Sequence, residues 1–195
     1  FQAVDYHKSF EPTPGIRVTY YDAGHILGSG SLRLEAEEDG RTTSMIFSGD
    51  IGRPQSLIVR DPENPPKADY VFMESTYGDR NHKNESTSTE ELAEAVAYSH
   101  TRGEKVIIPA FAVERTQEVL YCLHMLNSQG KLPEDMPVFV DSPLAIRATE
   151  IFERNRELFD EDAKALLGSG DNPFSLPNLH YTLSTAESQA INEIS

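Results

Sequence analysis

The chain has 195 residues and a formal net charge of −15, from 32 acidic residues against 17 lysines and arginines. Neither half is basic, because residues 1–80 hold 13 acids and 8 bases and residues 81–195 hold 19 and 9. This charge excludes a protein that coats nucleic acid through a general positive surface. The lack of a long apolar run argues against a membrane span. The single cysteine, Cys122, excludes an intrachain disulfide framework and favours a cytoplasmic location.

The first part of the chain predicts β-strands. Short apolar or alternating runs favour strands at residues 16–22, 31–36, 44–48 and 68–73. Asp39-Gly40, between the second and third run, is a typical hairpin turn pair. Residues 53–67 contain four prolines and are expected to form a surface loop.

After residue 80 the pattern changes to alternating helices and strands. A capping box at residues 87–90 opens a predicted helix that ends near Thr101, and Asp141 or Ser142 caps another helix with Pro143 at its first position. The remaining predicted elements are strands at 105–109, 137–140 and 179–183 and helices at 113–126 and 185–194. This alternation predicts a Rossmann-like unit with a mainly parallel sheet.

The first segment with chemical potential is Asp22–Gly30. It places His25 at the end of a predicted strand, beside glycines at 24, 28 and 30 that let the backbone bend sharply. An imidazole in such a loop can bind a metal ion, and the alternative is a structural or merely exposed histidine.

The second segment is Phe47–Arg53, in which an apolar strand leads to Asp50 within a glycine-bounded turn. Carboxylate oxygens can bridge two divalent cations, as they do in two-metal hydrolases. The alternative is that Asp50 only forms the turn.

The third segment is Val71–Asp79, in which Glu74 follows a run that we predict to be a buried strand. A carboxylate buried there is costly unless it is paired or catalytic. The alternative is a helix cap or a structural acid.

His25, Asp50 and Glu74 follow one another at intervals of 25 and 24 residues, each at the predicted end of a strand. Together these segments resemble the metallo-β-lactamase superfamily, and within it the β-CASP RNA-processing nucleases. Residues 108–118 and 141–145 are similar to strand-to-helix junctions of the β-CASP insert, so the resemblance covers nearly the whole chain.

The resemblance implies an α/β fold, with part of a metallo-β-lactamase β-sandwich in residues 1–80 and most of a β-CASP domain in residues 81–195. It implies that His25 binds one of two zinc ions and that Asp50 bridges both and takes part in catalysis. It also implies that Glu74 and a later histidine help to protonate the leaving oxygen. The implied activity is a zinc-dependent RNA phosphodiesterase, an endonuclease or 5′ exonuclease, that uses a metal-bound hydroxide.

The sequence departs from the family pattern in its metal ligands. The HxHxDH signature and the two late histidines of the family are absent, which leaves two ligands for a dinuclear site. Two ligands cannot hold such a site tightly. We therefore expect the chain to be an internal piece of a longer enzyme and, by itself, to be inactive and to bind zinc partially or not at all.

Arg115 and Ser142 stand at predicted strand-to-helix turns, where backbone N–H groups and the helix dipole favour anions. Binding of RNA phosphate is one interpretation, and helix capping with surface ion pairing is the other.

Two other function classes stay open at this point. The parent protein could be a non-catalytic β-CASP scaffold, or a metallo-hydrolase that acts on a small ester. The β-CASP-like segment after residue 80 favours RNA as the substrate over a small ester. The pattern also leaves open a homodimer, endonuclease against exonuclease action, and RNA against DNA.

Overall fold

The computed structural model describes residues 2–81 and 88–194. The chain divides into two compact units, the first made of Phe1–Arg80 with Leu158–Asp160 and the second of Asn81–Glu157 with Glu161–Ser195. Strands and helices are both present, which confirms the α/β class predicted from the sequence. No helix in this described part of the chain has both the length and the apolar character needed to cross a bilayer.

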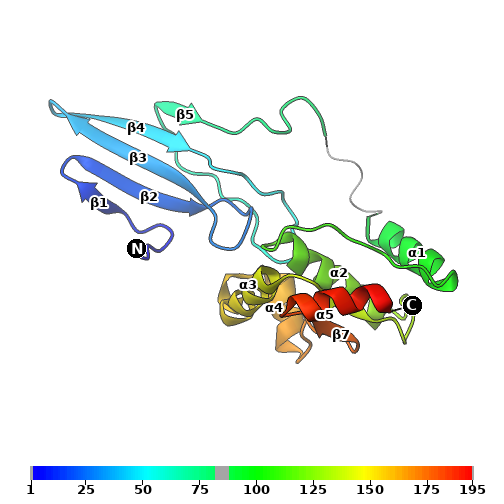
Figure 1. Ribbon diagram of the computed structural model, residues 1–195. Helices are drawn as coiled ribbons and strands as arrows, with labels where there is room; N and C mark the ends of the chain where they lie inside the picture. The colour runs from blue at the N-terminus through cyan, green and yellow to red at the C-terminus, as the bar shows by residue number, and fades with distance from the viewer. Residues whose placement is uncertain (1, 82–87, 195) are drawn as a thin grey trace. The chain divides into compact units, whose positions relative to one another are not determined.

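The first unit is built on one five-stranded sheet with the strand order β1-β2-β3-β4-β5 (Figure 1). The strands are β1 (Phe10–Thr13), β2 (Ile16–Asp22), β3 (Gly30–Glu38), β4 (Arg41–Phe47) and β5 (Tyr70–Phe72). The first four are antiparallel neighbours in chain order, whereas β5 pairs parallel to β4. A parallel pair needs a crossover connection, and residues 48–69 supply it.

Local sequence accounts for most of this sheet. The predicted strands at 16–22, 31–36 and 44–48 are confirmed as β2, β3 and β4, and Asp39 and Gly40 join β3 to β4 with φ of 50° and 74°. Two successive positive φ angles characterise the hairpin turn that matches strand twist. Strand β1 was not predicted; it contains Pro12, which suits the edge position that β1 occupies in the sheet.

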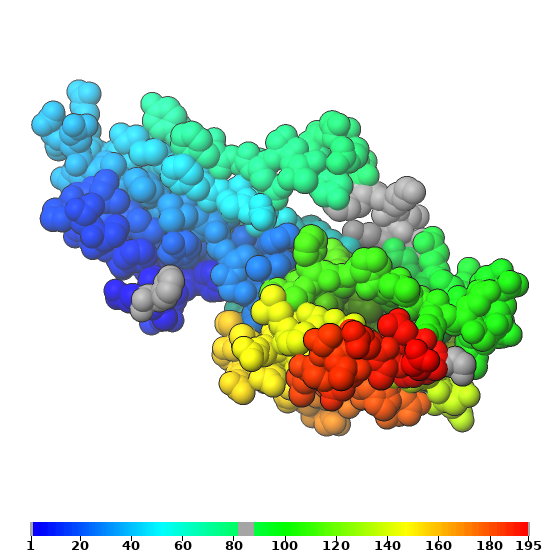
Figure 2. All heavy atoms as spheres, viewed as in Figure 1, coloured from blue at the N-terminus to red at the C-terminus, as the bar shows by residue number. Residues whose placement is uncertain are grey.

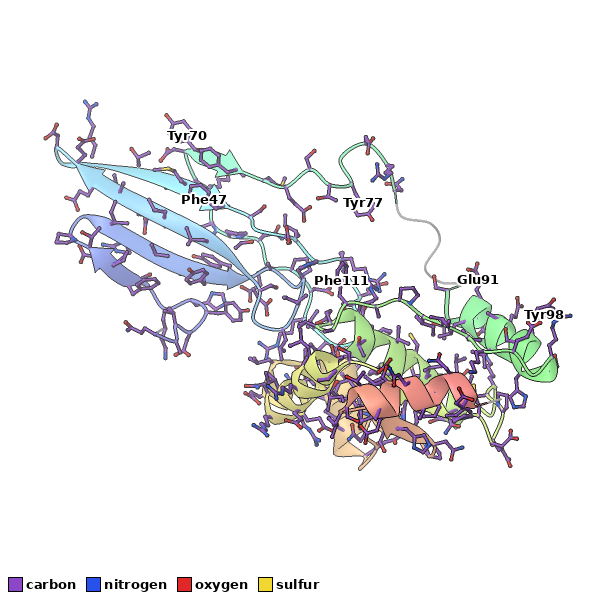
Figure 3. All side chains as sticks on the ribbon, in the orientation of Figure 1. Phe47, Tyr70, Tyr77, Glu91, Tyr98 and Phe111 are labelled. Atoms are coloured by element: carbon purple, nitrogen blue, oxygen red, sulfur yellow. The ribbon has the colours of Figure 1, made fainter. Side chains whose placement is uncertain are left out.

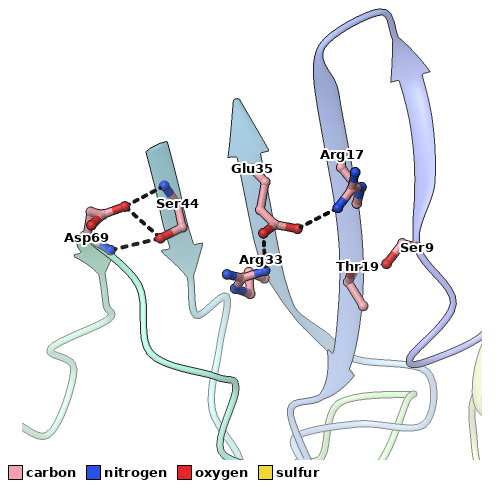
Figure 4. A network of polar contacts seen from close by, with 7 residues as sticks. All are labelled: Ser9, Arg17, Thr19, Arg33, Glu35, Ser44 and Asp69. Atoms are coloured by element: carbon pink, nitrogen blue, oxygen red, sulfur yellow. Dashed lines mark hydrogen bonds and ion pairs between the residues drawn. The ribbon is translucent and has the colours of Figure 1, made fainter. Parts of the chain in front are cut away.

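Polar side chains also connect neighbouring strands of the sheet (Figure 4). The Glu35 carboxylate on β3 lies 3.7 Å from the Arg17 guanidinium on β2 and 2.8 Å from that of Arg33 on its own strand, and Ser9 and Thr19 share a hydrogen bond of 2.7 Å. At the start of the β4–β5 pair, the Ser44 hydroxyl donates to the Asp69 carboxylate over 2.7 Å. This last contact lies directly before Met45 and Tyr70, where the pairing of β4 with β5 begins.

The second unit contains most of the helices around a small parallel sheet. Its helices are α1 (Ser88–Thr101), α2 (Arg115–Ser128), α3 (Pro143–Arg154), α4 (Glu161–Gly168) and α5 (Thr185–Ala190), with the short 3-10 turns η2 (Arg156–Leu158) and η3 (Ile191–Glu193). Strands β6 (Val138–Val140) and β7 (Leu179–Tyr181) pair in parallel. The predicted parallel direction is therefore confirmed for the strands that form.

Caps and burial explain these helices. After α2, the Gly130 N–H donates to the Asn127 carbonyl and the Lys131 N–H to the Leu126 carbonyl, the paired contacts of a glycine-terminated helix. Leu120, Leu126 and Phe152 are among the buried side chains that hold α2 and α3. Helix α5 buries no residue and lies on the surface of its unit (Figure 2, red).

Two predictions for the second unit need correction. Residues 105–109 were predicted as a buried strand, but they form no strand, and Ile107 is 86% exposed. A strand is stabilised by pairing, and in the described residues of this unit only β6 and β7 pair with each other. Helix α2 begins at Arg115 and not at Val113, and Thr87 of the predicted capping box lies outside the described residues.

Candidate active site

The sheet of the first unit brings three strand ends to one edge. Strands β2 and β4 are each antiparallel to β3 and so run the same way, and β5 is parallel to β4. The carboxyl ends of all three therefore point to the same edge of the sheet. We call this region the carboxyl edge. It is made of residues 22–25, 48–52 and 74, which lie at or just after the ends of β2, β4 and β5 in that order.

Backbone contacts tie these segments to one another. The Gly52 N–H donates to the Ala23 carbonyl over 2.8 Å, and the Ser48 N–H donates to the Phe72 carbonyl over 2.9 Å. A Cβ atom at Gly52 would lie 1.6 Å from the Gly24 carbonyl oxygen, so any side chain there would collide with the backbone. Gly52 thus permits the loop of Asp50 to lie against the loop of His25.

The His25 loop is shaped by side-chain oxygens that accept backbone hydrogen bonds. The Ser29 hydroxyl oxygen accepts from the His25 and Ile26 N–H groups over 3.0 and 3.2 Å. The Asp22 carboxylate accepts from the Gly24 N–H over 2.9 Å. Burial raises the pKa of Asp22, and the nearby Glu63 carboxylate acts in the same direction. The imidazole of His25 stays exposed at the end of this shaped loop.

Glu74 is anchored to the Asp50 loop. Its Oε1 accepts from the Ile51 N–H over 2.6 Å, and its own N–H donates to the Ser48 hydroxyl oxygen over 3.1 Å. The hydrogen bond from Ile51 is the main cause that holds the pKa of Glu74 below its ordinary value, with smaller contributions from Thr76 and His25. Glu74 is therefore a carboxylate at neutral pH, and it accepts hydrogen bonds instead of donating a proton.

One expectation about Glu74 is wrong. The strand before it was predicted to be buried, yet Tyr70, Val71 and Phe72 of β5 are 59, 59 and 54% exposed. Figure 3 shows the Tyr70 side chain on β5 and the Phe47 side chain on β4. The Phe47 and Phe72 rings stack with their centroids 4.8 Å apart. β5 borders the sheet among the described residues, and the pKa of Glu74 is set more by hydrogen bonding, which lowers it, than by burial, which raises it.

The donors at the carboxyl edge match zinc in type but not in number. An imidazole and a carboxylate, those of His25 and Asp50, are ordinary zinc ligands, and catalytic zinc sites use three protein ligands. Within residues 2–81 and 88–194, however, no three His, Cys, Asp or Glu side chains are grouped so that they could hold a metal ion. The described residues alone therefore do not make a zinc site.

Arg115 and Ser142 lie in the second unit and have partners there. Ser142 is the N-cap of α3, and its hydroxyl oxygen accepts from the Ala145 N–H over 3.2 Å. Arg115 begins α2, and its guanidinium pairs with the buried Glu118 carboxylate. Capping and ion pairing, the second interpretation of these residues, are what the structure contains.

Ser48 was not predicted from the sequence as a residue of the site. This serine is 5% exposed, its hydroxyl donates to the Gly49 carbonyl over 2.6 Å, and it accepts from the Glu74 N–H. The available signal was a hydroxyl residue directly before the Gly49-Asp50 turn, at the end of an apolar run.

Comparison with known proteins supports the family resemblance. The Beta-Casp domain family matches residues 116–195. The chain is 37% identical over 177 residues to ribonuclease TTHA0252 of Thermus thermophilus, which covers 91% of this chain and 39% of that protein. It is 33% identical over 177 residues to the RNase J-like protein of Methanocaldococcus jannaschii, with coverages of 89% and 40%.

A third relative also matches most of this chain but only part of its own length. The chain is 28% identical over 185 residues to endoribonuclease YSH1 of Kluyveromyces lactis, covering 92% of this chain and 24% of that protein. The chain thus spans at most about two fifths of the length of these relatives. The domain match and the three relatives agree with the order of the motifs, and they confirm the resemblance to the β-CASP nucleases.

Proposed function

We propose that the protein containing this chain is a metal-dependent phosphodiesterase that cleaves RNA. The observation that carries the proposal is the meeting of the His25, Asp50 and Glu74 segments at the carboxyl edge. The relatives named ribonuclease, RNase J-like protein and endoribonuclease support RNA as the substrate. The presence of a histidine and two acids on these segments favours an active enzyme over a non-catalytic scaffold.

Zinc is the proposed metal, with His25 and Asp50 as two of its ligands. Because the described residues offer too few donors, the proposal requires further ligands from outside residues 2–81 and 88–194. Zinc, when bound, supplies Lewis-acid chemistry that stabilises negative charge on phosphate oxygens and compensates for the acidity of this chain.

The proposed role of Glu74 is to orient a proton donor. Since Glu74 is held as a carboxylate by the Ile51 N–H, it can accept a hydrogen bond from an imidazole and favour the protonated form of that ring. A histidine so held can protonate the leaving oxygen of the RNA. Asp50 and His25 act separately from this proton transfer, as ligands.

The test compares the chain with the longest natural protein that contains it. The longer protein should cleave a labelled RNA, and a chelator followed by added zinc should abolish and restore the cleavage. A circular RNA of the same sequence separates the two modes, because only an endonuclease opens it. Absence of cleavage of any RNA, with hydrolysis of a small ester instead, would contradict the proposal.

The 195-residue chain by itself should behave differently. We expect it to leave RNA intact and to bind zinc more weakly than micromolar in calorimetry, because two ligands are too few. Submicromolar binding of two zinc ions would contradict the ligand argument. A cytoplasmic location and a homodimer stay predictions, to be checked by fractionation and by light scattering.

A further inference from the structure

Ser48 lies at the carboxyl edge and contacts β3 and β5. It follows β4 directly, its N–H donates to Phe72 at the end of β5, and its carbonyl accepts from the Ser31 hydroxyl on β3 over 2.8 Å. Its side chain is oriented by two contacts of its own, one to the Gly49 carbonyl and one from the Glu74 N–H. Every hydrogen-bonding group of this buried serine therefore has a partner in the first unit.

The Ser48 hydroxyl closes a ring of hydrogen bonds around the two acids. In this ring, Ser48 Oγ accepts from the Glu74 N–H, and the Glu74 carboxylate accepts from the Ile51 N–H. The backbone from Ser48 to Ile51, which includes Asp50, completes the ring. The hydroxyl hydrogen goes to the Gly49 carbonyl, which leaves a lone pair for the Glu74 N–H. The ring thus sets the position of the Asp50 turn relative to Glu74.

We propose that Ser48 is a positioning residue, whose hydroxyl sets the placement of Glu74 and of the Asp50 turn for RNA cleavage. This role rests on the proposed phosphodiesterase function. A supporting group of this kind typically changes metal affinity or activity by about ten- to hundredfold when it is removed. Threonine offers the same donor and acceptor, so it can replace serine chemically, whereas alanine cannot.

Ser44 provides a matched control on the same pair of strands. Its hydroxyl donates to Asp69 over 2.7 Å and accepts from the Asp69 N–H over 3.1 Å, so it links β4 to the start of β5. Ser44 and Ser48 therefore each fasten β4 to the segment of β5, but at opposite ends. Only Ser48 lies beside Asp50 and Glu74.

The first arm of the experiment measures amide hydrogen exchange by NMR in the 195-residue chain. In Ser48→Ala, the Glu74 and Ile51 amides should exchange at least about tenfold faster than in the wild type, because Glu74 loses its acceptor and its carboxylate loses its anchor. Ser48→Thr should restore slow exchange. Ser44→Ala should leave both amides unchanged, and the Asp69 N–H keeps the carbonyl of residue 44 as its acceptor over 3.0 Å.

The second arm measures RNA cleavage by the longer protein. Ser48→Ala should lower kcat by about ten- to hundredfold with KM nearly unchanged, Ser48→Thr should recover most of the rate, and Ser44→Ala should lower it less than threefold. Unchanged Glu74 exchange in Ser48→Ala, or equal loss of kcat in Ser48→Ala and Ser44→Ala, overturns the assignment. If the wild type cleaves no RNA, the proposed function fails, and the exchange arm alone decides whether Ser48 positions Glu74.

Discussion

The carboxyl edge of the first unit and the strand-to-helix junctions of the second were both expected to carry chemistry, and they use their polar groups differently. At the junctions, Ser142 caps α3, Arg115 pairs with Glu118, and Asp141 accepts from the Thr182 and Ser188 hydroxyls over 2.5 and 2.8 Å. At the carboxyl edge, hydrogen bonds hold backbone loops and leave His25 and Asp50 exposed.

This difference indicates which polar residues are available for a reaction. A side chain that caps a helix or neutralises a buried acid must give up that contact before it can bind a phosphate. The imidazole of His25 needs no such exchange, because Ser29 fixes the loop through its backbone. The contrast can be tested by changing residues in each region.

The largest expected difference is in RNA cleavage by the longer protein. Asp50→Asn should lower kcat by roughly hundredfold or more, because it removes the charge proposed to bind the metal. Arg115→Ala should lower cleavage by about tenfold or less and mainly destabilise the second unit, since it leaves the buried Glu118 without that cation. Steady-state kinetics with urea unfolding separates the two effects. An equal loss of kcat in both variants would remove the distinction between the regions.

The next effect concerns the close approach of the two loops. Gly52→Ala should destabilise the first unit by about 3 kcal/mol, because the added Cβ would overlap the Gly24 carbonyl. Gly168→Ala is the control, since nothing lies within 4 Å of a Cβ there and alanine favours the helix α4 that Gly168 ends. Urea unfolding followed by circular dichroism measures both. A stable Gly52→Ala variant would show that the loops do not lie in contact.

A smaller effect is expected at the cap of α3. Ser142→Ala should cost about 1 kcal/mol of stability, because the Ala145 N–H loses its acceptor, and should leave RNA cleavage within threefold. Ser184→Ala removes the equivalent cap of α5, a helix that buries no residue, and should shift the unfolding midpoint less. A hundredfold loss of cleavage in Ser142→Ala would instead support the phosphate-binding interpretation.

The smallest effect is the titration of Glu74. NMR of the carboxyl carbon should give a pKa below the ordinary glutamate value, and Thr76→Val should raise it part of the way. Because the pKa of the folded state is lowered, the contribution of Glu74 to stability is present above the pKa of the unfolded chain. It is lost as the pH falls through the pKa of the folded state. A Glu74 pKa at or above the ordinary value would mean that the Ile51 hydrogen bond does not form in solution.

The sequence by itself determined the features that depend on neighbours along the chain. Alternating residues and the Asp39-Gly40 turn were sufficient for β2, β3 and β4, and Ser142-Pro143 for the start of α3. These signals are local, because a turn or a cap is formed by residues a few positions apart. The motif order also indicated a resemblance to the β-CASP family, and the domain match supports it over residues 116–195.

Only the tertiary structure decided the features that depend on pairing between distant segments. The carboxyl edge exists because β5 pairs parallel to β4, and no local signal encodes the direction of that pairing. The exposure of β5 and the lack of a strand at residues 105–109 likewise depend on which partners are present. Ser48 acquires its role in the same way, because its hydroxyl meets the Glu74 N–H, 26 residues away, only after the strands have paired.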